Sequence, residues 1–327
     1  MRDVARLAGV SAQTVSRVSN GSPGVVEATR EQVIAAMREL GYRPNSAARA
    51  LKRGSFRTIG VILFTLATTG NVRTLEAIAA RAAEEDYAVT LIPVAAPTQA
   101  GVQGAFSRLN ELAVDAVIVI MEVHLLDYST VSLPAGTHAV VVDSEASEGY
   151  SVIDTDQADG TRKAVEHLLD LGHSTVWHVA GPSVSFASER RVGAWRATLA
   201  ARGCAEPPLL RGDWSADSGY EAGLSLTSSG CTAVFVANDQ MALGVLRAFH
   251  EKGIRVPQDV SIVGFDDIPD SSSFSPPLTT VHQDFAELGR RCVDKVLKQM
   301  TENSTQPGCE LVPTRLVVRS STAEVPK

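Results

Sequence analysis

The chain has 327 residues, of which 44% are hydrophobic, and a formal net charge of −7. This length allows more than one domain. The sequence has no apolar run long enough to span a membrane, no apolar N-terminal segment typical of export and no Cys-x-x-Cys pair among its four cysteines, so we expect a cytoplasmic protein without a metal, a disulfide or another cofactor.

Charge is distributed unevenly along the chain. The first 57 residues carry ten Lys or Arg and four Asp or Glu, a net charge of +6, whereas the remainder carries −13. A basic segment attached to an acidic body favours a nucleic-acid partner for the N-terminal part, although the total charge alone would argue against one.

The segment Asp3–Asn20 predicts two short helices joined by a tight turn. Gly9 lies where the turn needs a residue that tolerates positive φ, and Ser11 is placed to cap the second helix. The second helix would expose Gln13 and Arg17, whose side chains match the edges of adenine and guanine in the DNA major groove. A third helix is predicted from apolar residues at helical spacing, and its end is marked by Gly41 and Pro44; the apolar stripes of the three helices are Val4, Leu7, Ala8, Val15, Val18, Val33, Ile34, Met37 and Leu40.

After a short linker the pattern changes to apolar runs that alternate with amphipathic helices. Such alternation predicts parallel sheets covered by helices on both faces, and two successive sets predict an α/β body of two doubly wound lobes. The predicted strands are Thr58–Leu63, Ala88–Val94, Asp115–Met121, His138–Val142, Thr175–Ala180, Thr232–Ala237, Val260–Val263 and Leu278–His282, with Glu310–Ser321 as a final extended segment. The predicted helices are Arg73–Glu85, Val102–Leu112, Gly160–Leu171, Glu189–Arg202, Gln240–Glu251 and Ala286–Met300.

The N-terminal motif resembles the lactose-repressor family of bacterial transcription regulators. The phrase Val-Ala-x-x-Ala-Gly-Val-Ser-x-x-Thr-Val-Ser-Arg-Val-x-Asn runs from Val4 to Asn20, and Gly41–Asn45 continues the match. Further matching phrases lie in the body, at Asp159–Arg162, Gly212–Ala216, Val236–Gly244, Pro277–Thr280 and Gln283–Phe285. The resemblance implies a helix-turn-helix DNA-binding domain (1–44), a hinge helix and linker (45–56) and a two-lobed effector-binding and dimerisation domain (57–327) with a type I periplasmic-binding-protein-like fold. The first lobe would take about 57–172 plus 285–312.

Roles in DNA binding follow from the same resemblance. Gln13 and Arg17 would read bases, with an apolar contact from Ala12. Phosphate contacts are expected from Thr14, Ser16 and Asn20. The hinge residues Asn45, Ala48 and Leu51 would order on DNA, with Ala48 and Leu51 in the minor groove; for Leu51 the alternative is contact with the other subunit of a dimer.

A ligand site is expected at the carboxyl ends of the strands, in the cleft between the lobes. A sugar needs acids and amides for its hydroxyls and an aromatic face for its ring. The resemblance implies hydroxyl contacts from Asp159, Arg191, Asn238, Asp266 and Gln283, and apolar contacts from Trp214 and Phe285. Taken alone, Asp239 is more typical of a helix N-cap and Trp214 of a core.

Some positions depart from the family pattern. Phe64, Thr68, Gly70 and Asn71 stand where the family has an apolar patch against the sugar, and Ala187 replaces a serine. A pyranoside such as a galactoside therefore remains the expectation, with its identity open.

Together these features predict a non-enzymatic repressor that binds a pseudo-palindromic operator as a homodimer and loses DNA affinity when a sugar binds. No leucine heptad tail follows the body, which favours a dimer over a tetramer. The alternatives are a regulator with a purine-like corepressor, a transport sugar-binding protein and a glycoside-acting enzyme that uses Asp266 with Asp239. The helix-turn-helix argues against an enzyme, and so does the lack of a Gly-x-Ser-x-Gly, Walker or Gly-x-Gly-x-x-Gly motif.

Overall fold

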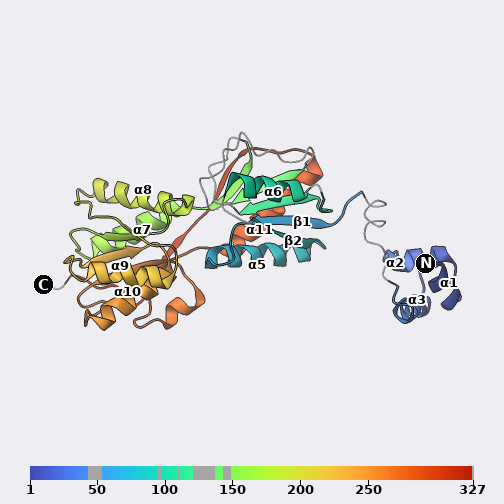
Figure 1. Cartoon of the computed structure of the whole chain (residues 1–327), viewed down its shortest axis with the longest axis horizontal. Coiled ribbons are helices and arrows are strands. Elements are labelled where there is room, and N and C mark those ends of the chain that lie inside the picture. Colours follow the sequence, from blue (N-terminus) through green and yellow to red (C-terminus); the bar gives the residue numbers. More distant parts are fainter. Residues whose placement is uncertain (43–53, 95–97, 110, 121–136, 143–148, 326–327) are drawn as a thin grey trace. The chain divides into compact units, whose positions relative to one another are not determined.

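The chain forms two compact units, Met1–Arg57 and Thr58–Lys327 (Figure 1). The computed structural model describes residues 1–42, 54–94, 98–109, 111–120, 137–142 and 149–325. The predicted boundaries at residues 44 and 56 stay predictions, since the first of them falls outside the described residues. No helix of the described residues is long and apolar enough to cross a membrane.

Within the described residues 1–42, the first unit is a bundle of three short helices, α1 (Arg2–Leu7), α2 (Ala12–Ser19) and α3 (Glu27–Glu39). Gly9 has φ +62° in the turn before α2, and the Ser11 hydroxyl accepts a hydrogen bond from the Thr14 backbone N–H at 3.0 Å, as predicted. The core is small and consists of Val4, Ala5, Val15, Val18, Val33 and Ala36. Leu7 and Leu40, which the apolar stripes include, remain 46% and 47% exposed. The three helices therefore pack against one another through valine and alanine side chains, and not through these leucines.

The described part of the second unit forms two six-stranded sheets, one in each lobe. The first-lobe sheet is parallel in the order β11-β5-β4-β3-β1-β2. The second-lobe sheet has the order β12-β10-β9-β8-β6-β7, and only β12 is antiparallel. The first-lobe strands are β1 (Thr58–Leu63), β2 (Ala88–Pro93), β3 (Ala116–Ile120), β4 (His138–Val142), β5 (Ser151–Thr155) and β11 (Gly308–Val312). The second-lobe strands are β6 (Trp177–Ala180), β7 (Leu210–Arg211), β8 (Ala233–Val236), β9 (Ser261–Asp266), β10 (Thr279–His282) and β12 (Arg315–Val317).

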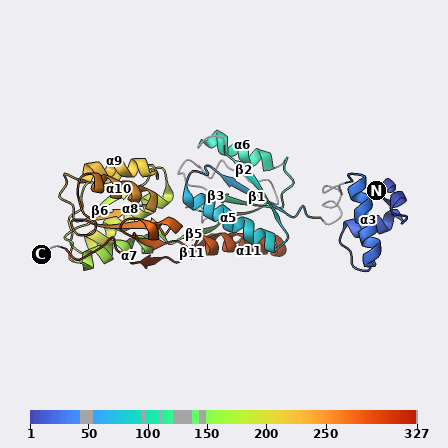
Figure 2. The same ribbon diagram turned by 90° about the horizontal axis from the view of Figure 1, so that it is seen from below.

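Helices cover both faces of each sheet, which explains why most strands are apolar runs rather than alternating patterns. In the first lobe α5 (Thr69–Glu84) and α11 (Phe285–Glu302) pack on one face, and α6 (Gln99–Leu109) packs on the other. In the second lobe α7 (Gln157–Asp170) and α8 (Phe186–Ala201) lie opposite α9 (Ala216–Leu226) and α10 (Asp239–Glu251), as both views show (Figure 2). A short 3-10 helix, η2 (Pro269–Ser273), follows β9.

The chain passes between the lobes three times, after β5, after β10 and after β11. The first lobe was predicted to extend from residue 57 to residue 172, and the end of this segment at residue 172 is wrong. Helix α7 belongs to the second lobe, because its apolar face (Val165, Leu168) is buried with Phe265 and Val281. Gly160 permits this approach, since a Cβ there would lie 2.9 Å from the Val281 side chain.

Four elements of the described residues, β5, β7, α9 and η2, were not predicted, and one predicted segment is divided. Strand β5 is short and partly polar, and α9 is rich in small residues. The small residues let α9 and α10 touch closely, since a Cβ at Gly219 would lie 2.1 Å from the Met241 carbonyl oxygen. The segment Glu310–Ser321 is not one extended element, because β11 joins the first-lobe sheet and β12 joins the second-lobe sheet.

Candidate ligand cleft and nucleic-acid interface

A cavity of about 620 Å³, including its open mouth, lies between the two lobes of the second unit. The ends of β5, β8 and β9 reach it, together with the N-terminal ends of α5, α8 and α11. It is lined by Thr68, Thr69, Gly70, Asn71, Thr74, Ile120, Val142, Asp154, Thr155, Gln157, Ser185, Ala187, Arg191, Trp214, Asn238, Asp266, Gln283, Phe285 and Leu288. Six of the seven residues predicted to contact a ligand are therefore brought together, and only Asp159 is not.

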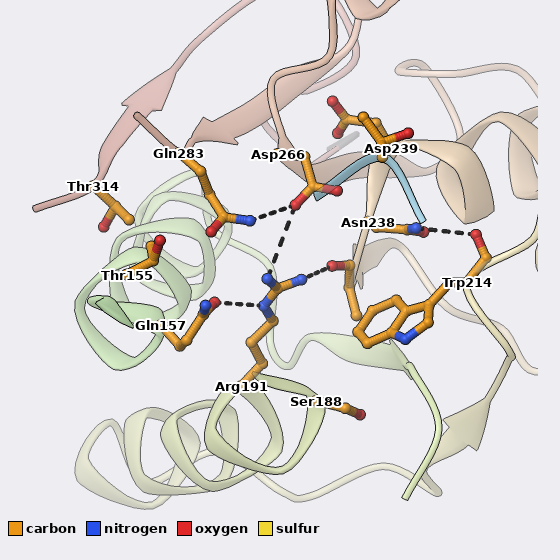
Figure 3. A network of polar contacts seen from close by, with 12 residues as sticks. Thr155, Gln157, Ser188, Arg191, Trp214, Asn238, Asp239, Asp266, Gln283 and Thr314 are labelled. Atoms are coloured by element: carbon orange, nitrogen blue, oxygen red, sulfur yellow. Dashed lines mark hydrogen bonds and ion pairs between the residues drawn. The ribbon is translucent and has the colours of Figure 1, made fainter. Parts of the chain in front are cut away.

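Asp266 ends β9 and is the buried acid of the second-lobe side. Its φ is +114°, a strained conformation for a residue with a side chain. Its carboxylate accepts a hydrogen bond from the Gln283 amide at 2.6 Å and lies 3.9 Å from the Arg191 guanidinium (Figure 3). Burial raises the pKa of Asp266 to about 6, although Arg191 and Gln283 act in the opposite direction. The side chain is thus held at the cavity wall by Gln283 and beside Arg191.

Arg191 is held rigidly on α8, where it is 3% exposed. Its Nε donates to the Gln157 side-chain oxygen at 2.9 Å, and its Nη1 donates to the backbone carbonyl of Ala237. The guanidinium lies over the Phe265 ring, 3.8 Å from the centroid, and 5.6 Å from the Trp214 centroid. These contacts fix the directions in which the guanidinium can donate hydrogen bonds. A guanidinium with fixed donor directions is suited to hydroxyl recognition.

Trp214 presents an aromatic face to the cavity from the loop before α9. The loop has an unusual backbone, with φ +75° at Trp214. A Cβ at Gly181 would lie 2.3 Å from the indole, so the ring rests directly on backbone at that glycine. Trp214 is half-buried rather than part of the core, and this geometry suits a platform for the apolar face of a ring.

Asn238 has a structural role that the sequence analysis assigned to its neighbour. Its Oδ1 accepts from the Met241 N–H at 2.9 Å and so caps α10, while its amide donates to the Trp214 carbonyl at 3.0 Å. Asp239 is not the cap. Its buried carboxylate accepts from the Thr280 hydroxyl at 2.6 Å and from the Ile268 N–H at 2.9 Å, and burial raises its pKa well above the usual range. Asp239 therefore joins the ends of β8, β9 and β10.

Asp159 lies outside the cavity, on the exposed side of α7. Its carboxylate is within 2.6 Å of the Arg162 guanidinium and 2.5 Å of the Lys163 ammonium group. Burial alone would raise the pKa of Asp159, but the hydrogen bonds from Lys163 and Arg162 lower it. The structure gives this residue a role in local ion pairs on the helix surface.

The cavity also contains an acid that the sequence analysis missed. Asp154 is 2% exposed and accepts from the Thr155 N–H at 2.7 Å and from Arg190 of α8. Burial raises the pKa of Asp154 to about 6, with Arg190 acting in the opposite direction. The Asp154–Arg190 pair joins the first lobe to the second, as does a hydrogen bond from Gln240 to the Thr69 hydroxyl.

Helix α2 carries the residues predicted to contact DNA. Ala12, Gln13 and Arg17 are exposed on one side of it. The Thr14 hydroxyl pairs with Ser11 at 2.9 Å, and the half-buried Asn20 amide donates to the Ser16 hydroxyl at 3.3 Å. The hinge residues Asn45, Ala48 and Leu51 lie outside the described residues.

Comparisons with known proteins cover nearly the whole chain. A family model described as bacterial regulatory proteins, lacI family, matches residues 1–45, and one described as a periplasmic binding protein-like domain matches residues 165–322. The lactose operon repressor of Escherichia coli (strain K12) is 39% identical over 98% of this chain and 89% of its own length. The HTH-type transcriptional repressor PurR of Haemophilus influenzae (strain PittEE) is 33% identical over 92% of this chain and 91% of its own length.

A solved structure has the same architecture. The crystal structure of the lac repressor dimer bound to operator and the anti-inducer ONPF superposes with a TM-score of 0.85 and 36% sequence identity, covering 98% of both chains. The predicted fold class, two doubly wound lobes of the periplasmic-binding-protein type behind an all-α helix-turn-helix head, is confirmed.

Proposed function

Since the chain belongs to the lacI family of bacterial regulatory proteins and is a DNA-binding transcriptional repressor with an effector-binding domain, we propose that its effector is a sugar that lowers the affinity of a homodimer for its operator. Its place of action would be the cytoplasm, where bacterial DNA lies.

The observation that carries the sugar proposal is the arrangement of Asp266, Gln283 and Arg191 next to Trp214. One buried carboxylate, one amide and one oriented guanidinium supply acceptors and donors for adjacent hydroxyls. The indole supplies a flat apolar surface at the same cavity. A pyranose matches this cavity because it carries several hydroxyl groups and has an apolar ring face. Asn238 and Phe285 would complete the site, Asn238 through the acceptor capacity left on its amide oxygen.

The proposed DNA interface is the exposed side of α2. Gln13 and Arg17 would contact base edges, and Ala12 a thymine methyl group. Thr14, Ser16 and Asn20 would contact phosphates. Their hydroxyl and amide groups, which are hydrogen-bonded within the head, would supply these contacts. A single helix-turn-helix covers only a few base pairs, so we infer that two heads of a homodimer bind a pseudo-palindromic operator.

Sugar and DNA would be coupled through the two lobes. A sugar that contacts both sides of the cavity favours one relative arrangement of the lobes, and DNA favours another. The coupling must be reciprocal, because each ligand changes the affinity for the other by the same factor.

The test uses an operator fragment selected from random DNA by the full-length chain. Operator affinity is measured with and without a panel of monosaccharides, disaccharides and purines. A sugar that weakens operator binding, and that fails to do so in an Asp266→Asn variant, is the expected result. A purine that strengthens operator binding would instead support the alternative, a regulator with a purine-like corepressor. If no compound of the panel changes the affinity, the effector proposal fails.

A further inference from the structure

The first-lobe side of the cavity is unusually polar for a wall that faces a sugar ring. Asn71 and Thr74 project from α5, and Asp154 and Thr155 end β5. Apolar side chains line the same lobe beside them, at Ile120, Val142, Phe285 and Leu288. The first-lobe wall therefore combines apolar side chains with hydroxyl, amide and carboxylate groups.

Two hydroxyls of this group have unused hydrogen-bonding capacity. Thr74 and Thr155 are 3% and 2% exposed, and neither side-chain hydroxyl has a hydrogen-bond partner among the residues that the structure describes. Neither oxygen is among the fully buried unpartnered atoms of the described residues, so each hydroxyl reaches the cavity, and a bound molecule that displaces water there has to supply the hydrogen bond. Both residues line the cavity, where a bound molecule can supply that partner.

Asp154 adds a buried carboxylate to the same group. Thr155 N–H occupies one of its oxygens and Arg190 the other, whereas an ionised carboxylate accepts about four hydrogen bonds. Arg190 both neutralises the charge and ties Asp154 to the second lobe. The carboxylate lines the same cavity as the two threonines.

We propose that Thr74, Asp154 and Thr155 form a second polar subsite, which binds a hydroxyl-bearing group of the effector on the side opposite Asp266. This inference rests on the proposed sugar function and narrows it. The effector is hydroxylated at both ends, as a free monosaccharide or a disaccharide is, and is not a glycoside whose second substituent is an alkyl group. An alkyl group in this position would supply no hydrogen bond to either hydroxyl or to the remaining acceptor capacity of the carboxylate.

The test exchanges each unpartnered hydroxyl for a methyl group of the same shape. Thr74→Val and Thr155→Val remove only the hydroxyl, and Thr161→Val is the matched control. Thr161 is fully buried on α7 with an unpartnered hydroxyl, but it does not line the cavity. Thermal unfolding of each variant checks that the fold is intact.

The ligands are galactose, glucose, lactose and cellobiose, each compared with its isopropyl glycoside by titration calorimetry on the full-length chain. We expect the wild-type chain to prefer the free sugar. Each of the two cavity variants should weaken binding of that sugar by roughly 2- to 10-fold and leave the isopropyl glycoside unchanged, as expected for one hydrogen bond. Thr161→Val should change neither affinity.

A wild-type preference for isopropyl glycosides, or unchanged affinity in both cavity variants, would overturn the second subsite and leave the sugar function standing. If no member of the panel binds the wild-type chain, the sugar function falls and this inference falls with it.

Discussion

Replacing Asp266 by Asn should stabilise the second lobe at neutral pH while it impairs sugar binding. Burial raises the pKa of Asp266 from 3.8 to about 6. A pKa difference of this size corresponds to about 3 kcal/mol between the protonated and ionised forms. Asparagine resembles the neutral acid, still accepts from Gln283 after rotation of its amide, and tolerates the positive φ of this position better than most residues.

The effect has a defined pH dependence. The folded chain holds the Asp266 proton more tightly than the unfolded chain does, so the contribution of this acid to stability is complete below pH 4 and is lost as the pH rises through 6. The difference in unfolding free energy between Asp266→Asn and wild type should therefore increase between pH 4 and 7.5, by at most about 3 kcal/mol. His178, whose pKa burial lowers to about 3, titrates in both proteins and cancels in the difference.

Urea unfolding followed by tryptophan fluorescence measures this difference. All three tryptophans, Trp177, Trp195 and Trp214, lie in the second lobe, so the signal reports the part of the molecule that contains Asp266. Calorimetry on the same variant should show sugar affinity reduced by about 10- to 150-fold, since a hydrogen bond to a charged group is worth about 1.5–3 kcal/mol. A stability difference that does not vary with pH would refute the assignment of Asp266 as a buried acid kept for binding.

The other predictions concern the head and the helix packing. Arg17→Ala should weaken operator binding by about 5- to 150-fold with no change in sugar affinity, because a base contact is worth about 1–3 kcal/mol; equal losses on operator and random DNA would show a phosphate contact instead. Ser11→Ala should destabilise the head by about 1 kcal/mol through the lost cap to Thr14, measured by faster hydrogen exchange within residues 1–42 of the full chain. Gly244→Ala should destabilise the second lobe by about 1–3 kcal/mol, since a Cβ there would lie 1.9 Å from a backbone oxygen of α9. Gly193→Ala, in open space on α8, should stabilise it by about 0.5–1 kcal/mol, and matching urea midpoints for the two variants would refute the packing argument.

Local sequence patterns predicted most helices and strands because each element was long enough to show its period. They did not predict which sheet a helix covers. The apolar face of α7 is visible in the sequence, but its partner strands β10 and β12 follow more than 100 residues later. The lobe boundary was therefore placed one helix too late.

The candidate site shows the same limit. Asp266, Arg191 and Trp214 were predicted together from their positions and from the family resemblance, and the cavity brings them together. Asp154 was not predicted to line the cavity because β5 was not predicted. Asp159, five residues later in the chain, was predicted as a ligand contact instead. The turn from β5 into α7 directs Asp159 toward Lys163 and Asp154 toward the cavity, and this direction depends on the pairing of β5 with β4 and β11.

A linkage measurement shows whether the cavity and the head are coupled. Sugar affinity is measured by titration calorimetry on the full-length chain, alone and saturated with the selected operator fragment. We predict that the operator weakens sugar binding by the same factor by which the sugar weakens operator binding. Equal sugar affinities with and without operator would contradict the account, because a sugar that binds both states equally cannot release DNA.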